Sequence, residues 1–184
     1  MDIPKLYELY KTHYLVTTDT RAIPTNSLFF ALKGDHFNGN SFAAQALSLG
    51  ARFAIIDEKA YQTDKRMILV EDALQTLQDL ANYHRKQLQL PIIGLTGSNG
   101  KTTVTQMIAA ILRADESQAS LSTQGNLNNE IGVPLTLFNL RAYHRRAVIE
   151  LGMNHPGEIE VLARFAQPTV GLVNNAQREH QEYM

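Results

Sequence analysis

The sequence contains no cysteine, no long apolar run and no excess of charge of either sign. The absence of cysteine excludes disulfide bonds and thiolate metal sites, and it fits a reducing compartment. The first residues, MDIPKLYELYKTHY, lack the apolar core of a signal peptide, and no run reaches the length of a membrane span. Lysine and arginine number 17 against 18 aspartate and glutamate residues, so no overall field attracts nucleic acid or an anionic membrane. We therefore expect a cytoplasmic protein that binds no nucleic acid and does not insert into membranes.

Apolar runs and helical patterns alternate along the 184 residues, of which 44% are hydrophobic. This alternation predicts an α/β fold with mainly parallel sheets. Pro91 interrupts the second long helical pattern, because proline disfavours helix in the preceding residue and donates no hydrogen bond. We therefore expect a small N-terminal α/β domain over residues 1–89 and a second α/β domain over residues 90–184.

The apolar runs predict strands, and the periodic segments between them predict helices. Helices are expected from Asn40 or Ser41 to Gly50, and from Asp72 with Gln75 in a capping box. A third begins after the glycine-rich loop, and a fourth begins at Asn154 or His155 with Pro156 in its first turn. The third helix is expected to bury Val104, Met107, Ile108, Ile111 and Leu112. The expected strands are 27–33, 52–57, 67–70, 92–96, 118–123, 147–152 and 169–175.

The segment GLTGSNGKTT, from Gly94 to Thr103, has the composition of a phosphate-binding loop between a strand and a helix. Such a loop needs glycines where the backbone approaches phosphate oxygens, with amide N–H groups and a helix N-terminus around them. The strict motif fails at one position, since Leu95 stands where its first glycine belongs. The alternative is a glycine-rich turn with a surface lysine. The expected ATP-binding residues are Gly97, Ser98, Asn99, Gly100, Lys101, Thr102 and Thr103.

Lys101 is expected to neutralise the β- and γ-phosphates, and the Thr102 hydroxyl is expected to hold Mg²⁺. Magnesium prefers several oxygen ligands, so a carboxylate at a neighbouring strand end is expected as well. Glu150 ends the apolar run AVIE and has this place in the topology. Its alternative is a solvated strand-end carboxylate. His180 follows the last strand, where we expect it to bind the metal or to contact a residue that does. The alternative is an ordinary surface histidine.

Four segments in the second half follow one another as they do in Mur ligases: TGSNGKTT, GNLNNEIGVPLTL, ELGMNHPGEI and NNAQREH. In the first half, TDTRAIPTNSLFFALKGDHFNGNSF resembles the uridine-nucleotide-binding segment of that family. The sequence is therefore similar to the Mur ligase family over nearly its whole length. Within the family, the segments are similar to those of the member that adds D-alanyl-D-alanine.

The resemblance implies ATP-dependent formation of an amide bond between UDP-N-acetylmuramoyl-tripeptide and D-alanyl-D-alanine through an acyl phosphate, in peptidoglycan synthesis. It implies catalytic roles for Lys101, Glu150 and His180, and metal ligation by Thr102, Glu150 and His180. Asn-rich turns also cap helices, so a helix-capping loop is the alternative for the segment that contains Asn126, Asn128, Asn129 and Glu130. Arg21 and Lys33 are, without the family, two basic loop residues. The implied substrate-binding residues are Thr20, Arg21, Lys33 and Gly34, and Asn126, Asn128, Asn129 and Glu130.

The family has three domains, so the resemblance implies that this chain is an N-terminal fragment, inactive alone, of an enzyme that we expect to be a monomer. One alternative is a phosphate-loop kinase or nucleotide switch, which does not predict GNLNNEIGVP or ELGMNHPGEI. Another is a different ligase of the superfamily, such as a folylpolyglutamate synthetase or another Mur ligase. A third is a nucleotide-sugar-binding module without catalysis. Loss of Lys101, Thr102 or Glu150 would favour it, and all three are present.

Overall fold

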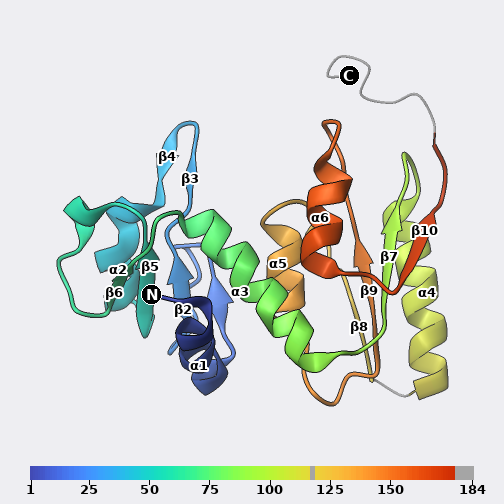
Figure 1. The fold of residues 1–184 in the computed structure, drawn as a ribbon, viewed down its shortest axis with the longest axis horizontal. Coiled ribbons are helices and arrows are strands. Elements are labelled where there is room, and N and C mark those ends of the chain that lie inside the picture. Colours follow the sequence, from blue (N-terminus) through green and yellow to red (C-terminus); the bar gives the residue numbers. More distant parts are fainter. Residues whose placement is uncertain (117–118, 177–184) are drawn as a thin grey trace. The chain divides into compact units, whose positions relative to one another are not determined.

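The computed structural model describes residues 1–116 and 119–176 of the chain. The chain divides into two compact units, Met1–Tyr83 and His84–Met184, each of which contains a parallel sheet with helices (Figure 1). The predicted α/β class is therefore confirmed. The division falls inside one helix, α3 (Ala73–Leu88), a few residues before the boundary that Pro91 suggests. In the described part of the chain, no helix combines the length and the apolar character needed to cross a membrane.

The first unit contains a four-stranded parallel sheet in the order β1-β2-β5-β6. A short antiparallel hairpin, β3 with β4, follows β2. The helix α1 and the strand β1 have no counterpart among the predicted elements. The bounds are α1 Ile3–His13, β1 Val16–Thr17, β2 Leu28–Phe30, β3 Lys33–Gly34, β4 Phe37–Asn38, η1 Gly39–Phe42, α2 Ala43–Ser48, β5 Phe53–Ile56, η2 Lys59–Tyr61 and β6 Met67–Leu69.

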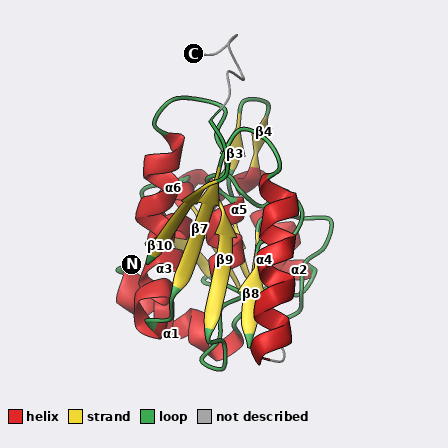
Figure 2. Ribbon diagram, turned by 90° about the vertical axis from the view of Figure 1, so that its right-hand side faces the viewer, coloured by secondary structure: helices red, strands yellow, loops and turns green. Residues whose placement is uncertain are grey.

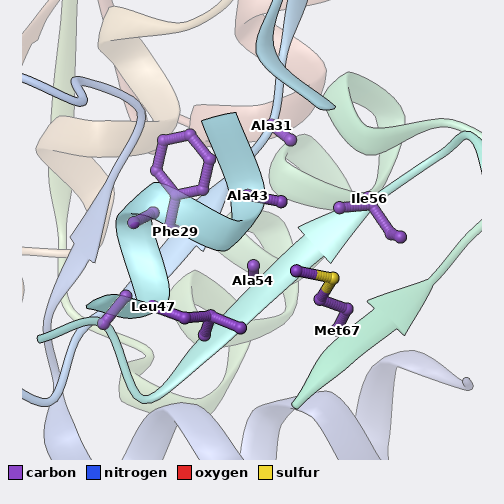
Figure 3. Packing of buried hydrophobic residues seen from close by; sticks show 9 residues of the cluster. Phe29, Ala31, Ala43, Leu47, Ala54, Ile56 and Met67 are labelled. Carbon is purple, nitrogen blue, oxygen red and sulfur yellow. The ribbon is translucent and has the colours of Figure 1, made fainter. Parts of the chain in front are cut away.

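One hydrophobic cluster of this unit lies between the central strands and α2 (Figure 3). Phe29 and Ile56 come from β2 and β5, Ala43 and Leu47 come from α2, and each is at most 6% exposed. Small side chains on the facing surfaces, including Ala54, let the short helix approach the sheet closely. The continuous apolar runs of these strands are therefore buried as the sequence predicts.

Helix starts in this unit differ in detail from the prediction. The Asp72 carboxylate accepts a hydrogen bond from the Gln75 backbone N–H at 2.8 Å, which caps α3. The Gln75 side chain donates to Asp79 instead of closing the expected capping box. Before α2, Asn38 caps the 3₁₀ turn η1, so the α-helix proper begins at Ala43, after the predicted start.

The second unit contains a parallel sheet in the order β10-β7-β9-β8. Helix α4 covers one face of this sheet, and α5 and α6 lie on the opposite face (Figure 1 and Figure 2). Because the strands are parallel, their carboxyl ends meet at one edge, which is where ligands bind in open α/β sheets. The bounds are β7 Ile92–Thr96, α4 Lys101–Glu116, β8 Ser120–Ser122, α5 Gly132–Leu137, β9 Arg146–Glu150, α6 Glu158–Ala166 and β10 Val170–Val173.

Two predictions about helices in this unit are wrong in part. On α4, Met107 and Ile111 are 60% and 68% exposed, although Leu112 is buried with Thr105 and Ala109. Helical spacing alone does not say how wide the buried stripe is, and here a buried threonine and alanine shift it. Helix α6 begins at Glu158, because Gly157 at φ 90° lies outside helical geometry.

Candidate functional site

The predicted phosphate loop connects β7 to α4 at the carboxyl edge of the sheet. Gly97 and Gly100 have φ values of 149° and 74°, in the region that favours glycine, so the loop reverses direction between them. Lys101 is the first residue of α4. In the first turn of a helix, the backbone N–H groups have no partner within the helix, so those of Lys101, Thr102 and Thr103 are available to a ligand at this end of α4. This arrangement suits an anion.

The Lys101 side chain folds back onto the loop. Its Nζ donates hydrogen bonds to the carbonyl oxygens of Gly97 at 2.6 Å and Ser98 at 2.8 Å. The ammonium is thereby held at the mouth of the loop, where a phosphate chain would meet it. It must exchange at least part of these bonds for phosphate oxygens when such a ligand binds.

Glu150 ends β9 directly beside the loop, since Leu95 of β7 pairs in register with Glu150. The carboxylate is buried, because the residue is 1% exposed. Its Oε1 accepts from the Asn128 amide at 2.8 Å and from the Thr102 hydroxyl at 3.3 Å. The backbone N–H of Glu150 donates to Thr123 Oγ1 at 2.9 Å. The alternative of a solvated strand-end carboxylate is therefore wrong.

The second carboxylate oxygen of Glu150, Oε2, is buried and has no hydrogen-bond partner among the residues that the structure describes. Leaving a buried carboxylate oxygen unpaired is costly, so a cation at this position would remove the cost. Thr102 supplies a hydroxyl oxygen next to the same carboxylate. Hard oxygen ligands of this kind fit Mg²⁺. The residues present thus fit the metal, although the described residues include no cluster of three or more His, Asp or Glu side chains.

The Asn-rich segment before α5 has two roles in the structure. Asn128 contacts Glu150, and its backbone oxygen accepts from the Gly152 N–H at 2.7 Å. Asn129 instead stabilises the turn that leads into α5, because its side-chain oxygen accepts from the N–H groups of Ile131 and Gly132. The capping alternative therefore describes Asn129 and not Asn128. The remaining two predicted residues of the segment, Asn126 and Glu130, are exposed.

A cavity of about 660 Å³ opens beside Lys101. Asn128, Asn129 and Glu130 form one part of its wall, and the Gly152–Glu158 segment with the first turns of α6 forms the rest. Glu158 shapes this wall, since its carboxylate accepts from the backbone N–H groups of Asn154 and His155. These hydrogen bonds hold the pKa of Glu158 below its usual value. The cavity is large enough for part of a substrate next to the phosphate loop.

The predicted substrate residues of the first unit lie on β3 and on the turn after β1. Lys33 Nζ lies 3.2 Å from Asp57 Oδ1 and 3.6 Å from Glu58 Oε1, and the hydrogen bond with Asp57 raises the pKa of Lys33. Gly34 follows Lys33 on β3. Burial raises the pKa of Asp57, but hydrogen bonds from Asn40, Ala73 and Lys33 outweigh it and leave the pKa below its usual value. Lys33 is thus already held by two carboxylates.

Arg21 is the other basic residue of this predicted set. Its Nη2 lies 2.7 Å from Asp19 Oδ2, and hydrogen bonds from Arg21 lower the pKa of Asp19 to about 2. The Arg21 side chain is 88% exposed, so the guanidinium remains open to solvent beside this carboxylate. Thr20 lies next to it in the turn. The roles of these residues in substrate binding stay predictions.

His180 lies outside the described residues. The sequence reasoning missed two neighbours of the loop, Asn174 and Asn175, which follow β10 and contact the loop through several hydrogen bonds. The signal that could have found them is a pair of carboxamide residues at the end of a strand that is parallel to the strand of the phosphate loop.

Two family models match the chain. The model described as the Mur ligase family, catalytic domain, matches residues 12–85, and the model of the Mur ligase middle domain matches residues 95–184. The chain belongs to the Mur ligase family. Membership decides against the phosphate-loop kinase and the nucleotide switch, which share only the loop.

Curated Mur ligases resemble the chain over most of its length. It is 43% identical over 169 residues to the UDP-N-acetylmuramoyl-tripeptide–D-alanyl-D-alanine ligase of Haemophilus influenzae, which covers 91% of this chain and 37% of that protein. The ligase of the same name from Escherichia coli is 43% identical over 167 residues, with 91% and 36% covered. The chain therefore spans little more than a third of the length of these relatives.

Solved structures of Mur ligases give the same relationship. A crystal structure of MurF from Acinetobacter baumannii matches with a TM-score of 0.83 and 38% identity, covering 92% of this chain and 36% of that one. The MurF ligase of Thermotoga maritima in complex with ADP matches with a TM-score of 0.78 and 30% identity, covering 88% and 37%. The fold described above is therefore that of the corresponding part of a Mur ligase.

Proposed function

We propose that this chain supplies the ATP-binding site and the UDP-precursor-binding unit of a ligase that joins D-alanyl-D-alanine to UDP-N-acetylmuramoyl-tripeptide. The observation that carries the proposal is the group formed by Lys101, Thr102 and Glu150 at the mouth of the phosphate loop, with the buried Glu150 Oε2 left unpaired. The activity for which the curated relatives are named supports the choice of substrates. Both the nucleotide and the UDP precursor are found in the cytoplasm, so we place the reaction there.

In this proposal the loop binds the triphosphate and orients its γ-phosphoryl group. The N–H groups at the start of α4 donate to phosphate oxygens, and Lys101 moves from the loop carbonyls to the β- and γ-phosphates. Thr102 and Glu150 would hold Mg²⁺, which supplies charge neutralisation at the transferring phosphoryl group. Positioning and charge neutralisation are the main contributions of a protein to phosphoryl transfer.

The cavity beside Lys101 would hold the carboxyl end of the peptide precursor. Asn128 lies between this cavity and Glu150, so it fixes the carboxylate while it lines the substrate side. In a ligase of this type, the precursor carboxylate attacks the γ-phosphate, the bond to the β-phosphate oxygen breaks and ADP leaves. The amine of D-alanyl-D-alanine then attacks the acyl carbon, loses a proton and displaces inorganic phosphate, which leaves the amide bond. The cavity wall near Lys101, which includes Asn128 and the 152–158 segment, would orient the attacking carboxylate.

The test is calorimetric titration of the chain with Mg-ATP and, separately, with UDP-N-acetylmuramoyl-tripeptide. Lys101→Ala is expected to weaken Mg-ATP binding by about tenfold to a hundredfold, because charge-assisted hydrogen bonds to phosphate are lost. The same variant is expected to bind the UDP precursor as the wild type does. The matched control is Lys86→Ala, which removes an exposed lysine of α3 in the same unit.

Equal Mg-ATP affinity in Lys101→Ala and the wild type would overturn the assignment of the loop. A folded wild-type chain that does not bind the UDP precursor would overturn the assignment of the first unit and favour another ligase of the superfamily.

A further inference from the structure

The two residues that follow β10 lie against the phosphate loop. Val173 of β10 pairs in register with Thr96 of β7, so the chain leaves both strands at the same level. The Asn174 N–H continues the ladder by donating to the Thr96 carbonyl at 2.9 Å. The next residue, Asn175, accepts from the Ser98 N–H through its backbone oxygen at 3.2 Å. Asn174 and Asn175, here called the asparagine pair, thus extend the sheet alongside the loop.

The asparagine pair binds both backbone polar groups of Asn99 at the tip of the loop. Asn175 Oδ1 accepts from the Asn99 N–H at 2.9 Å. The carbonyl oxygen of Asn99 accepts from Asn175 Nδ2 at 2.9 Å and from Asn174 Nδ2 at 2.8 Å. Three hydrogen bonds from side chains therefore meet at the backbone of Asn99. One carboxamide, that of Asn175, engages both its donor and its acceptor.

The loop glycines make room for this contact. A Cβ atom at Gly97 would lie 3.1 Å from the backbone N and O of Asn175 and 3.2 Å from the Cβ of Asn174. At Gly100 it would lie 3.3 Å from the Asn174 amide nitrogen. Both glycines also have positive φ values. The close approach that glycine permits is therefore used here by the asparagine pair as well as by a phosphate chain.

These contacts have a consequence for phosphate binding, and the inference rests on the proposed ATP site. We propose that Asn175, assisted by Asn174, is a positioning residue that holds the phosphate loop in its binding shape through both polar groups of Asn99. The Asn99 N–H is committed to Asn175 and does not donate to phosphate. The triphosphate is bound by the N–H groups from Gly100 to Thr103 and by Lys101.

The experiment compares Asn175→Ala with the wild type by calorimetric titration with Mg-ATP. We expect about tenfold weaker binding, because the variant loses two hydrogen bonds that order the loop before the ligand arrives. Asn174→Ala removes one of the two donors to the Asn99 carbonyl, so a loss of about threefold is expected. It also serves as the second variant if Asn175→Ala does not fold.

Two further measurements separate positioning from general destabilisation. Denaturant unfolding is expected to give Asn175→Ala a stability similar to that of the control Asn139→Ala, whose exposed carboxamide donates to the Leu135 carbonyl in the same unit. Amide hydrogen exchange, followed by NMR, is expected to show that Asn99 is protected in the wild type without nucleotide. The protection of Asn99 should be lost in Asn175→Ala, while the amide of Leu95 inside β7 is unchanged.

Unchanged or tighter Mg-ATP binding by Asn175→Ala would overturn the positioning role. A wild-type Asn99 amide that becomes protected only after Mg-ATP is added would also overturn it, because that N–H would then donate to phosphate. A wild-type chain that does not bind Mg-ATP at all would overturn the proposed function instead, so the two failures are distinguishable.

Discussion

The imidazole of His84 is 1% exposed, and its Nε2 donates to the carbonyl oxygen of Leu140 at 3.0 Å. Burial lowers the pKa of His84 to about 4, and the nearby charge of Arg141 acts in the same direction. In the unfolded chain, the residue takes up a proton near pH 6.5, its ordinary pKa. The folded protein therefore loses stability as the pH falls from about 6.5 to about 4, and this contribution is complete above that window.

His84→Gln removes this titration. We expect the free energy of unfolding of the wild type to fall, relative to the variant, by up to about 3 kcal/mol between pH 6.5 and pH 4. Urea unfolding at a series of pH values measures the difference. Parallel curves for the two proteins across this window would show that the folded His84 titrates normally.

Lys101 and Thr102 were expected from the loop motif and Glu150 from its position at the end of a neighbouring strand, and the structure brings the three to one edge of the sheet. The contacts of Asn174 and Asn175 depend on the register between β10 and β7, which no local pattern reveals. Asn128 and Asn129 are neighbours of the same type, so their different roles were also beyond the sequence.

Among the elements, α6 is held at its C-terminal end by a side chain from α3. The Arg85 guanidinium is buried and donates to the carbonyl oxygens of Ala166 at 3.1 Å and Gln167 at 3.2 Å. A cation at this end of a helix is favourable, and the last carbonyl groups need partners from outside the helix. Burial lowers the pKa of Arg85, although the group stays charged.

Arg85→Ala is expected to lower the free energy of unfolding by about 2 kcal/mol, because two charge-assisted hydrogen bonds are lost and a buried space is left. The control is Arg164→Ala on α6, whose exposed ion pair with Glu160 should contribute less than about 0.5 kcal/mol. Denaturant unfolding compares the two. Similar losses in both variants would remove the special role of Arg85.

Elements whose bounds depend on distant contacts were harder to predict from the sequence than elements whose bounds are set locally. The strand over residues 92–96 was predicted with the bounds that β7 has, because a short apolar run between a proline and a glycine loop allows little else. Helix α6 was predicted to start too early, because the hydrogen bonds from Asn154 and His155 to Glu158 form a turn before it. Met107 and Ile111 were placed inside because spacing does not define the covered face.

At the scale of the whole molecule, each unit has its own parallel sheet and its own predicted ligand. The predicted residues for the UDP precursor fall in Met1–Tyr83, apart from those of the Asn-rich segment, and the predicted residues for ATP fall in His84–Met184. The α/β class was predictable because the alternation of strand and helix patterns runs through both halves. The aligned part of the chain covers 37% of the relative from Haemophilus influenzae.

The buried Oε2 atom of Glu150 is expected to lower the stability of the metal-free protein while it serves the proposed binding of a cation. In the proposed function this oxygen binds a cation, so the metal-free protein keeps in its interior a carboxylate oxygen that has no partner among the described residues, where a neutral side chain of the same shape would cost less. Glu150→Gln is therefore expected to unfold at a higher temperature than the wild type without magnesium and nucleotide, by about 1 kcal/mol in free energy. With Mg-ATP the order should reverse, because the ligand stabilises the wild type more than a variant that lacks the proposed carboxylate ligand of Mg²⁺. Thermal unfolding with and without Mg-ATP measures both differences, and a metal-free variant that melts below the wild type would contradict this view.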